Sequence, residues 1–134
     1  MQLQGTILFG PEFDLIEGTI TIDNGHISHI EEEANSSTDI ILPAFINSHT
    51  HIGDSVAKDA GSGLSLDELV APPDGLKHRL LAAATPEDLI SQMRKSITLM
   101  ESTGVAAFAD FREGGVDGVN MLHKAHSNSN VEAI

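Results

Sequence analysis

The chain has 134 residues, with seven Lys and Arg against twenty Asp and Glu, a formal net charge of −13 at pH 7 and no cysteine. This length suffices for one ordinary domain with a core, and the acidic balance argues against binding nucleic acid or an anionic membrane, because both need a basic face. The lack of cysteine excludes disulfides and thiolate metal ligands, and without a recognisable signal peptide or an apolar run of transmembrane length we expect a cytoplasmic protein.

The opening of the chain has the pattern of β-strands. Residues 3–9 form a candidate strand that ends at a Gly10-Pro11 breaker. Residues 18–22 and 26–30 alternate between apolar and polar side chains on either side of Asn24-Gly25. Because both turn residues tolerate positive φ, the sequence predicts a tight β-hairpin.

The apolar side chains of this hairpin are predicted to face a buried side of the sheet. They are Ile20, Ile22, Ile27 and Ile30. The last two differ in parity, which predicts a bulge or twist. His26 and His29 are three residues apart, which suits neither one face of a strand nor a chelate, so we expect them on the surface.

The stretch 42–54 holds the main chemical signal of the chain. A short apolar run leads into His49 and His51, and side chains i and i+2 of an extended strand point the same way. Two imidazoles so placed at a strand end can bind one metal ion, and Gly53 and Asp54 then interrupt the strand. The spacing alone is equally compatible with a pair that merely hydrogen-bonds in a loop.

The connection from residue 53 to about residue 85 is predicted to be mostly loop, with one or two helical turns at 66–70. Loops of this length in a compact domain are usually functional. Lys77, His78 and Arg79 bring positive charge into this connection, which would suit contact with an anionic or polar substrate. Ordinary solvated loop residues are the simpler interpretation.

A helix and a second strand are expected next. Thr85 is the predicted N-cap, Pro86 occupies the first helical position, and Gly104 marks the end. One apolar face of this helix is formed by Leu89, Met93, Ile97 and Met100. Residues 105–111 have the composition of a buried strand, so strand, helix and strand predict a β-α-β unit with parallel strands.

The remaining residues predict a second helix at about 116–127 and a third strand at 131–134. His123 and His126 lie three residues apart on that helix. A zinc pair at this spacing is conceivable, but both lie away from the strand ends, so we expect surface histidines.

Three segments resemble the amidohydrolase superfamily of metal-dependent hydrolases. The first-strand signature of the family, an apolar Pro-Gly-apolar-apolar-(Asp/Asn)-x-His-x-His run, is similar to residues 43–51, with Ala44 in place of the usual glycine. Residues 20–30 are similar to the hairpin of its small β-sandwich. Residues 101–111 resemble the second-strand region of the cytosine deaminase and chlorohydrolase-like branch.

The resemblance implies an α/β fold, with an incomplete β-sandwich segment at 1–42 and the first part of a TIM-type (β/α)8 barrel at 43–134. The remaining strands are not in this sequence, so we expect the N-terminal portion of a longer enzyme or one part of a split one. Asp110, Arg112 and Glu113 then stand at the catalytic face of the barrel. Arg112 and Glu113 are candidate substrate-binding residues, with a buried arginine–carboxylate pair as the alternative.

By the same resemblance, His49 and His51 help to hold a divalent metal ion, most often zinc, in an enzyme with a small-molecule substrate. The ion would lower the pKa of a bound water, and the hydroxide would attack a carbonyl or amidine carbon. The implied reaction is hydrolysis of a non-peptide carbon–nitrogen bond, by deamination or cyclic amide hydrolysis. The other ligands and the proton-transferring aspartate of the family are absent, so we expect this chain alone to be inactive.

Two other classes remain open. One is a catalytically incompetent fragment or interaction module, whose exposed edges need another chain or a second copy to complete the barrel. The other is a small binding domain in which the two histidines are structural.

Overall fold

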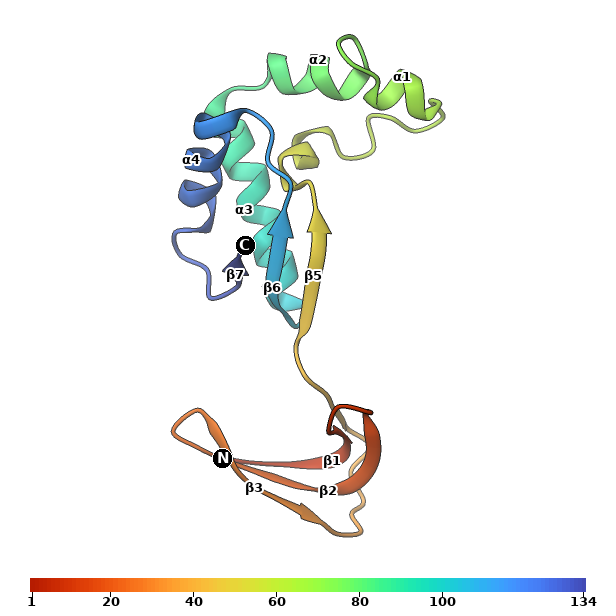
Figure 1. Cartoon of the computed structure of the whole chain (residues 1–134), viewed down its shortest axis with the longest axis vertical. Helices are drawn as coiled ribbons and strands as arrows, with labels where there is room; N and C mark the ends of the chain where they lie inside the picture. Colours follow the sequence, from red (N-terminus) through yellow and green to blue (C-terminus); the bar gives the residue numbers. More distant parts are fainter. The chain divides into compact units, whose positions relative to one another are not determined.

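The computed structural model describes all residues from Met1 to Ile134. The chain forms two compact units, Met1–Pro43 (unit 1) and Ala44–Ile134 (unit 2). Unit 1 is a four-stranded sheet of order β3-β2-β1-β4, and unit 2 contains a three-stranded sheet of order β5-β6-β7 (Figure 1).

The strands of unit 1 form a meander with a short parallel edge. They are β1 (Gln2–Phe9), β2 (Asp14–Asp23), β3 (His26–Glu32) and β4 (Ile40–Ile41). β2 pairs antiparallel with both β1 and β3, and β4 runs parallel to β1. Asn24 and Gly25 have φ angles of 52° and 79°, as a two-residue hairpin turn requires. The predicted hairpin is therefore confirmed.

The hairpin also contains the predicted irregularity. The register of β2 and β3 shifts between Thr21 and Ile22. Beyond the shift, one predicted core residue faces outward, since Ile20 is 5% exposed whereas Ile27 is 59% exposed. The prediction of a shared buried face is thus wrong for Ile27. Both histidines of the hairpin are exposed, as expected.

Unit 2 alternates parallel strands with helices. Its elements are β5 (Phe45–Thr50), the 3₁₀-helix η1 (Ile52–Ala57), α1 (Leu66–Val70), α2 (Leu76–Ala83), α3 (Pro86–Ser102), β6 (Val105–Asp110), α4 (Gly115–His126) and β7 (Glu132–Ala133). β5 pairs parallel with β6, and β6 pairs parallel with β7 (Figure 1). The predicted β-α-β order is confirmed, and the three strands do not close into a barrel.

The connection between β5 and α3 carries more helix than predicted. Lys77, His78 and Arg79 lie on α2 rather than in a loop, and Arg79 is exposed. α1 has a recognisable start, because Ser65 and Glu68 form a reciprocal capping box. α2 has neither a side-chain N-cap nor a buried residue, so the usual signals of a helix are missing from its sequence.

Helix α3 and its neighbours build the core. Thr85 Oγ1 accepts a hydrogen bond from Asp88 N at 3.1 Å, and Gly104 follows the helix with a φ of 80°, so both predicted ends are confirmed. The core residues are at most 9% exposed and comprise Ile52, Met93, Ile97, Phe108, Leu122, Ala125 and Val131. None of the helices combines the length and the apolar character needed to cross a bilayer.

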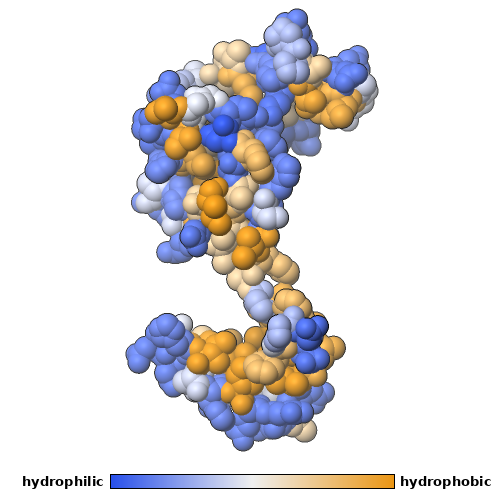
Figure 2. All heavy atoms as spheres, in the orientation of Figure 1, coloured by the Kyte–Doolittle hydropathy of each residue, from blue (hydrophilic) through white to orange (hydrophobic).

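Large apolar side chains also remain on the surface of both units (Figure 2). In unit 2, Phe45 and Ile46 of β5 are 57% and 69% exposed, and Phe111, which follows β6, is 56% exposed. β5 is an edge strand of its sheet. An edge strand with exposed apolar side chains offers a surface on which another segment can pair.

Two positions on α3 provide a matched test of the core. Ile97 is 1% exposed and Leu99 is 55% exposed. Ile97→Ala should lower the free energy of unfolding by about 2–5 kcal/mol, because it leaves a cavity. Leu99→Ala should change it by no more than about 0.5 kcal/mol. Urea denaturation followed by circular dichroism measures both changes, and equal effects would contradict this packing.

Candidate metal centre

The carboxyl end of β5 presents two imidazoles side by side. His49 lies on β5 and His51 directly follows it, and their Nε2 atoms are 3.3 Å apart. The ring centroids are 5.3 Å apart and the ring planes are tilted by 52°. Two nitrogens bound to one tetrahedral zinc at about 2.0–2.1 Å would stand roughly 3.3 Å apart. The spacing of this donor pair therefore fits a shared divalent ion, and it equally fits a hydrogen bond between one protonated and one free nitrogen.

Phe111 packs against both imidazoles. Its ring centroid lies 4.6 Å from that of His49 and 5.7 Å from that of His51, with tilts of 44° and 32°. Tilted aromatic contacts at these distances are favourable and restrict ring rotation. The local sequence predicts only that Phe111 is a strand residue, because nothing in it identifies the rings that Phe111 contacts.

The side chain of Asp110 connects the ends of β5 and β6. Its Oδ1 atom accepts hydrogen bonds from Thr50 Oγ1 at 2.9 Å and from Ile52 N at 2.7 Å. These partners flank His51, and they lie 60 and 58 residues before Asp110 in the chain. The Asp110 side chain is 0% exposed. Its place at the strand end was predicted, but these bonds were not, because they depend on the register of two distant strands.

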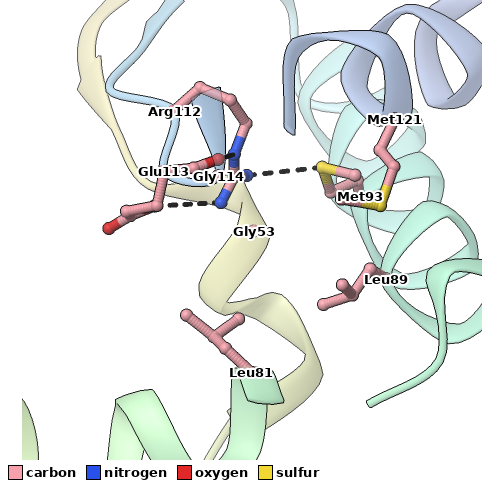
Figure 3. A pocket seen from close by; sticks show the side chains of 8 residues that line it. All are labelled: Gly53, Leu81, Leu89, Met93, Arg112, Glu113, Gly114 and Met121. Carbon is pink, nitrogen blue, oxygen red and sulfur yellow. Dashed lines mark hydrogen bonds and ion pairs between the residues drawn. The ribbon is translucent and has the colours of Figure 1, made fainter. Parts of the chain in front are cut away.

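Arg112 is buried in a network of ionic and polar contacts (Figure 3). Its guanidinium lies 3.6 Å from Asp110 Oδ2 and 2.9 Å from Glu113 Oε2, and Nη1 lies 3.5 Å from Met93 Sδ. Its side chain is only 9% exposed. Gly53 makes room for it, because a Cβ at that position would lie 1.8 Å from Nη2. Burial and pairing with two carboxylates are typical of an arginine that stabilises the end of a strand.

The same guanidinium lines a cavity of about 190 Å³ between helices of unit 2 (Figure 3). The lining residues are Gly53, Leu81, Leu89, Met93, Arg112, Glu113, Gly114 and Met121. Most of this lining is apolar, and both charged residues are already paired with each other. The cavity thus offers few free polar groups to a polar substrate.

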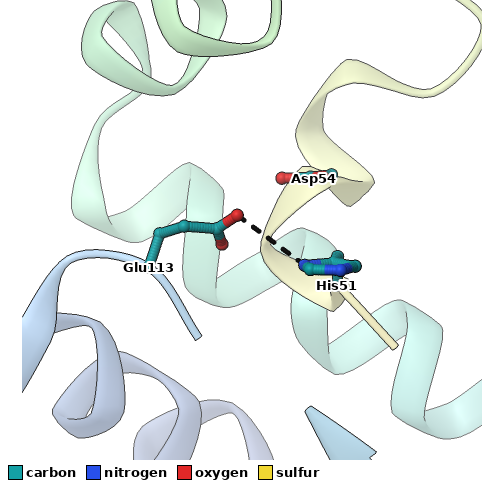
Figure 4. A group of neighbouring side chains, drawn as sticks. All are labelled: His51, Asp54 and Glu113. Atoms are coloured by element: carbon teal, nitrogen blue, oxygen red, sulfur yellow. Dashed lines mark ion pairs between the residues drawn. The ribbon is translucent and has the colours of Figure 1, made fainter. Parts of the chain in front are cut away.

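Glu113 contacts both His51 and a lysine from α2. Figure 4 shows its carboxylate facing the His51 ring. Its Oε1 atom is 3.7 Å from His51 Nδ1 and accepts a hydrogen bond from Lys77 Nζ at 2.5 Å. Lys77 Nζ is also 2.9 Å from Asp54 Oδ2. The interpretation of Lys77 as a solvated loop residue is therefore wrong, because its side chain is only 15% exposed and paired with two carboxylates.

His51, Asp54 and Glu113 each offer an atom that could bind a metal, and these atoms lie within 4.8 Å of one another. Lys77 already balances the charge of both carboxylates. A cation at this position would have to displace the ammonium group, so the His49–His51 pair is the better candidate for a metal.

Burial and pairing set the charges of this network. Burial disfavours the charged form of Lys77, but hydrogen bonds and attraction from Glu113 and Asp54 outweigh it and raise the Lys77 pKa above its usual 10.5. Burial acts to raise the pKa of Glu113, but hydrogen bonds from Lys77 and the backbone, with the charges of Lys77 and Arg112, lower it below 4.5. Both groups are charged at neutral pH.

The other candidate histidines lie outside this centre. His78 Nε2 is 3.1 Å from the carbonyl oxygen of Val70. His123 is exposed, as predicted. The prediction is wrong for His126, which is partly buried and whose Nε2 contacts the carbonyl oxygen of Val131.

Comparison with known sequences identifies relatives among archaeal proteins. No family model matches the chain. A "Putative aminohydrolase" of Methanothermobacter thermautotrophicus is 43% identical over 128 residues, which cover 90% of this chain and 33% of that protein. The 5'-deoxyadenosine deaminase of Methanosarcina barkeri is 27% identical over 107 residues, or 74% of this chain and 24% of that protein. The chain spans about a third of the length of the first relatives it matches.

Solved structures share the fold over nearly the whole chain. The 5-methylcytosine deaminase of Klebsiella pneumoniae, liganded with 5-fluorocytosine, matches with a TM-score of 0.68 and 16% identity, covering 99% of this chain and 35% of that one. The atrazine chlorohydrolase TrzN of Arthrobacter aurescens, complexed with zinc, matches with a TM-score of 0.64 and 17% identity, covering 98% and 34%. At these identities the likeness is one of fold.

Lys77→Met tests the ionic network around Glu113. The change leaves Asp54 and Glu113 without their shared cation, so the free energy of unfolding should fall by about 1–2 kcal/mol at neutral pH, allowing for solvent screening. Lys95→Met is the control, because Lys95 is exposed on α3, and it should have little effect. Denaturant titration measures both variants.

The loss caused by Lys77→Met should depend on pH. The Glu113 pKa is lowered, so the contribution of Glu113 is complete above pH 4.5 and is lost as pH falls through its folded-state pKa. The Lys77 pKa is raised, so its contribution persists up to pH 10.5. The difference between parent and variant should therefore shrink only in acid or strong alkali. A difference that does not change in acid would contradict the pairing.

Proposed function

We propose that this chain provides two ligands, His49 and His51, of a metal-dependent hydrolase, because it matches the N-terminal portion of amidohydrolase-superfamily proteins in sequence and in fold. The resemblance recognised in the sequence is thereby confirmed. We assign residues 1–42 to a β-sandwich segment and residues 43–134 to the first strands and helices of the barrel.

One observation carries the proposal, the 3.3 Å separation of the two Nε2 atoms at the carboxyl end of β5. Neutral imidazole is a common ligand of zinc, and a catalytic zinc takes about three protein ligands with one open position. This chain offers two at the pair, so we infer that the others come from residues outside it.

Side chains of this chain would hold and surround such an ion. His49 and His51 would bind it through Nε2. A bound ion supplies a Lewis acid and a water of lowered pKa. Glu113, whose side chain is 38% exposed, can accept hydrogen bonds from a substrate amino or hydroxyl group. Arg112 is only 9% exposed and is paired with Glu113. We therefore assign it an indirect part in substrate binding, in which it holds the Glu113 carboxylate in place.

We infer that the reaction is hydrolysis of a non-peptide carbon–nitrogen bond in a small molecule, by deamination or by opening of a cyclic amide. The names of relatives and structural neighbours support this class, since they include an aminohydrolase, a 5'-deoxyadenosine deaminase and a 5-methylcytosine deaminase. The zinc complex of the chlorohydrolase supports zinc as the ion.

A second candidate function is an interaction module that requires another chain to complete the barrel. The exposed side chains of Phe45 and Ile46 on the edge strand β5 favour it. In that case the two histidines would bind metal only in the assembled protein.

Metal titration separates the two candidates. The parent should bind zinc, and His49→Ala and His51→Ala should each weaken binding by more than the roughly 10- to 100-fold that loss of an outer-shell partner costs. The control variants His26→Ala and His29→Ala remove an exposed pair on β3 and should bind like the parent. Isothermal titration calorimetry measures all of them, and a parent that takes up no zinc favours the interaction module.

Deamination, the first of the two proposed reactions, is tested by ammonia release. The chain combined with a polypeptide that supplies the remaining barrel strands should release ammonia from an aminated heterocycle, because the site is then complete. Treatment with a chelator should abolish this release and added zinc should restore it. Ammonia release that survives complete metal removal, verified by elemental analysis, would refute a metal-dependent mechanism.

A further inference from the structure

The backbone pairing of β5 is irregular where the two histidines stand. Its register with β6 shifts between Asn47 and Thr50, and His49 lies inside this interval. β5 ends at Thr50, so His51 lies beyond the regular strand. An irregular ladder leaves backbone groups without regular partners. The sheet alone therefore does not define where the two imidazoles point.

Contacts from the end of β6 compensate for this irregularity. Asp110 Oδ1 accepts from Thr50 Oγ1 at 2.9 Å and from Ile52 N at 2.7 Å. In addition, Phe111 N donates to the carbonyl oxygen of Thr50 at 2.9 Å. Two of these contacts hold backbone atoms immediately before and after His51, and the third holds the side chain of Thr50. The hydroxyl of Thr50 also lies 3.0 Å from the carbonyl oxygen of Ala109, so one proton serves two acceptors.

The carboxylate of Asp110 has little freedom to rotate. Both hydrogen bonds fall on Oδ1, whereas Oδ2 is buried without a hydrogen bond and lies 3.6 Å from Arg112 Nη1. The side chain is 0% exposed, so water cannot replace a partner that is lost. Hydrogen bonds to a carboxylate are stronger than those between neutral groups.

Phe111 acts on the rings rather than on the backbone. Its ring lies 4.6 Å from that of His49 and 5.7 Å from that of His51. Asp110 and Phe111 are consecutive residues, so one strand end contacts both the backbone and the rings of the histidine pair.

We propose that Asp110 and Phe111 are positioning residues, which hold His49 and His51 with their Nε2 atoms converging. The purpose of this arrangement rests on the proposed metal-binding function. The arrangement itself can be measured without metal, in the purified chain.

Nuclear magnetic resonance of the imidazole C–H groups provides that measurement. The His49 and His51 signals are assigned with His49→Ala and His51→Ala variants, and in the parent they should carry a ring-current shift from Phe111. Phe111→Leu should abolish the shift while keeping an apolar side chain. Asp110→Ala should shift or broaden both signals. The internal controls, which should not move, are His26, His29, His78, His123 and His126.

Conservative variants distinguish positioning from a general role in stability. Asp110→Asn keeps an Oδ1 acceptor and should keep parental signals. Thr50→Val keeps the shape of the side chain but removes the hydroxyl contacts with Asp110 Oδ1 and with the carbonyl oxygen of Ala109, and it should move the His51 signal. Thr50→Val decides the question if Asp110→Ala does not fold. Variants that lower the melting temperature but leave both histidine signals unmoved would overturn the proposal.

Metal affinity gives a second readout. Zinc association by Asp110→Ala should be about 10- to 100-fold weaker than that of the parent, with Asp110→Asn closer to the parent. Equal zinc affinity in the parent, Asp110→Ala and Thr50→Val would also overturn the proposal. A parent that binds no zinc favours the interaction module instead, and the metal-free signals then decide the positioning roles of Asp110 and Phe111.

Discussion

The buried carboxylate of Asp110 joins two parallel strands at the point where regular pairing between them stops. It accepts hydrogen bonds from Thr50 and from Ile52, and the residue between them is His51. The following residue, Phe111, packs against both imidazoles. The side-by-side placement of the imidazole pair therefore depends on the end of β6 as much as on β5. The spacing of His49 and His51 makes a candidate metal site only together with these contacts from Asp110 and Phe111.

Charge in this region is balanced by two cations that come from different elements. Arg112 follows β6 and reaches the carboxylates of Asp110 and Glu113, and Lys77 reaches Glu113 and Asp54 from α2. In a chain of net charge −13, each acidic group near the histidines has one of these partners. The network links α2 and η1 to the strand ends, so helix α2, which has no buried residue, still contributes to the site.

Much of the fold could be predicted from local sequence, since its signals are local in origin. Asn24-Gly25 specifies a hairpin through positive φ, and Thr85 specifies a helix start through its hydroxyl. The exposure of Ile27 could not be predicted, because it depends on where the bulge falls. The local sequence does not predict helix α2, because this helix lacks a side-chain N-cap and a buried face. By contrast, the two-residue spacing of His49 and His51 predicts that their side chains lie side by side, because side chains i and i+2 of a strand point the same way.

The residues that surround the histidine pair could not be predicted from local sequence, for one physical reason. The hydrogen bonds of Asp110, the ring contacts of Phe111 and the ion pairs of Lys77 all join residues that are far apart in sequence. Parallel strands need long crossovers, so these contacts depend on register and helix placement that no short motif encodes. Gly53 illustrates this point, because its need to be glycine comes from the guanidinium of Arg112.

X-ray absorption at the zinc edge of the zinc-loaded protein tests most directly whether the two imidazoles share one ion. The geometry predicts a first shell containing two imidazole nitrogens at about 2.0–2.1 Å, with the imidazole contribution lost in a His49→Ala, His51→Ala double variant. A shell of oxygen atoms alone, or a spectrum unchanged in the double variant, would contradict a metal centre at the end of β5.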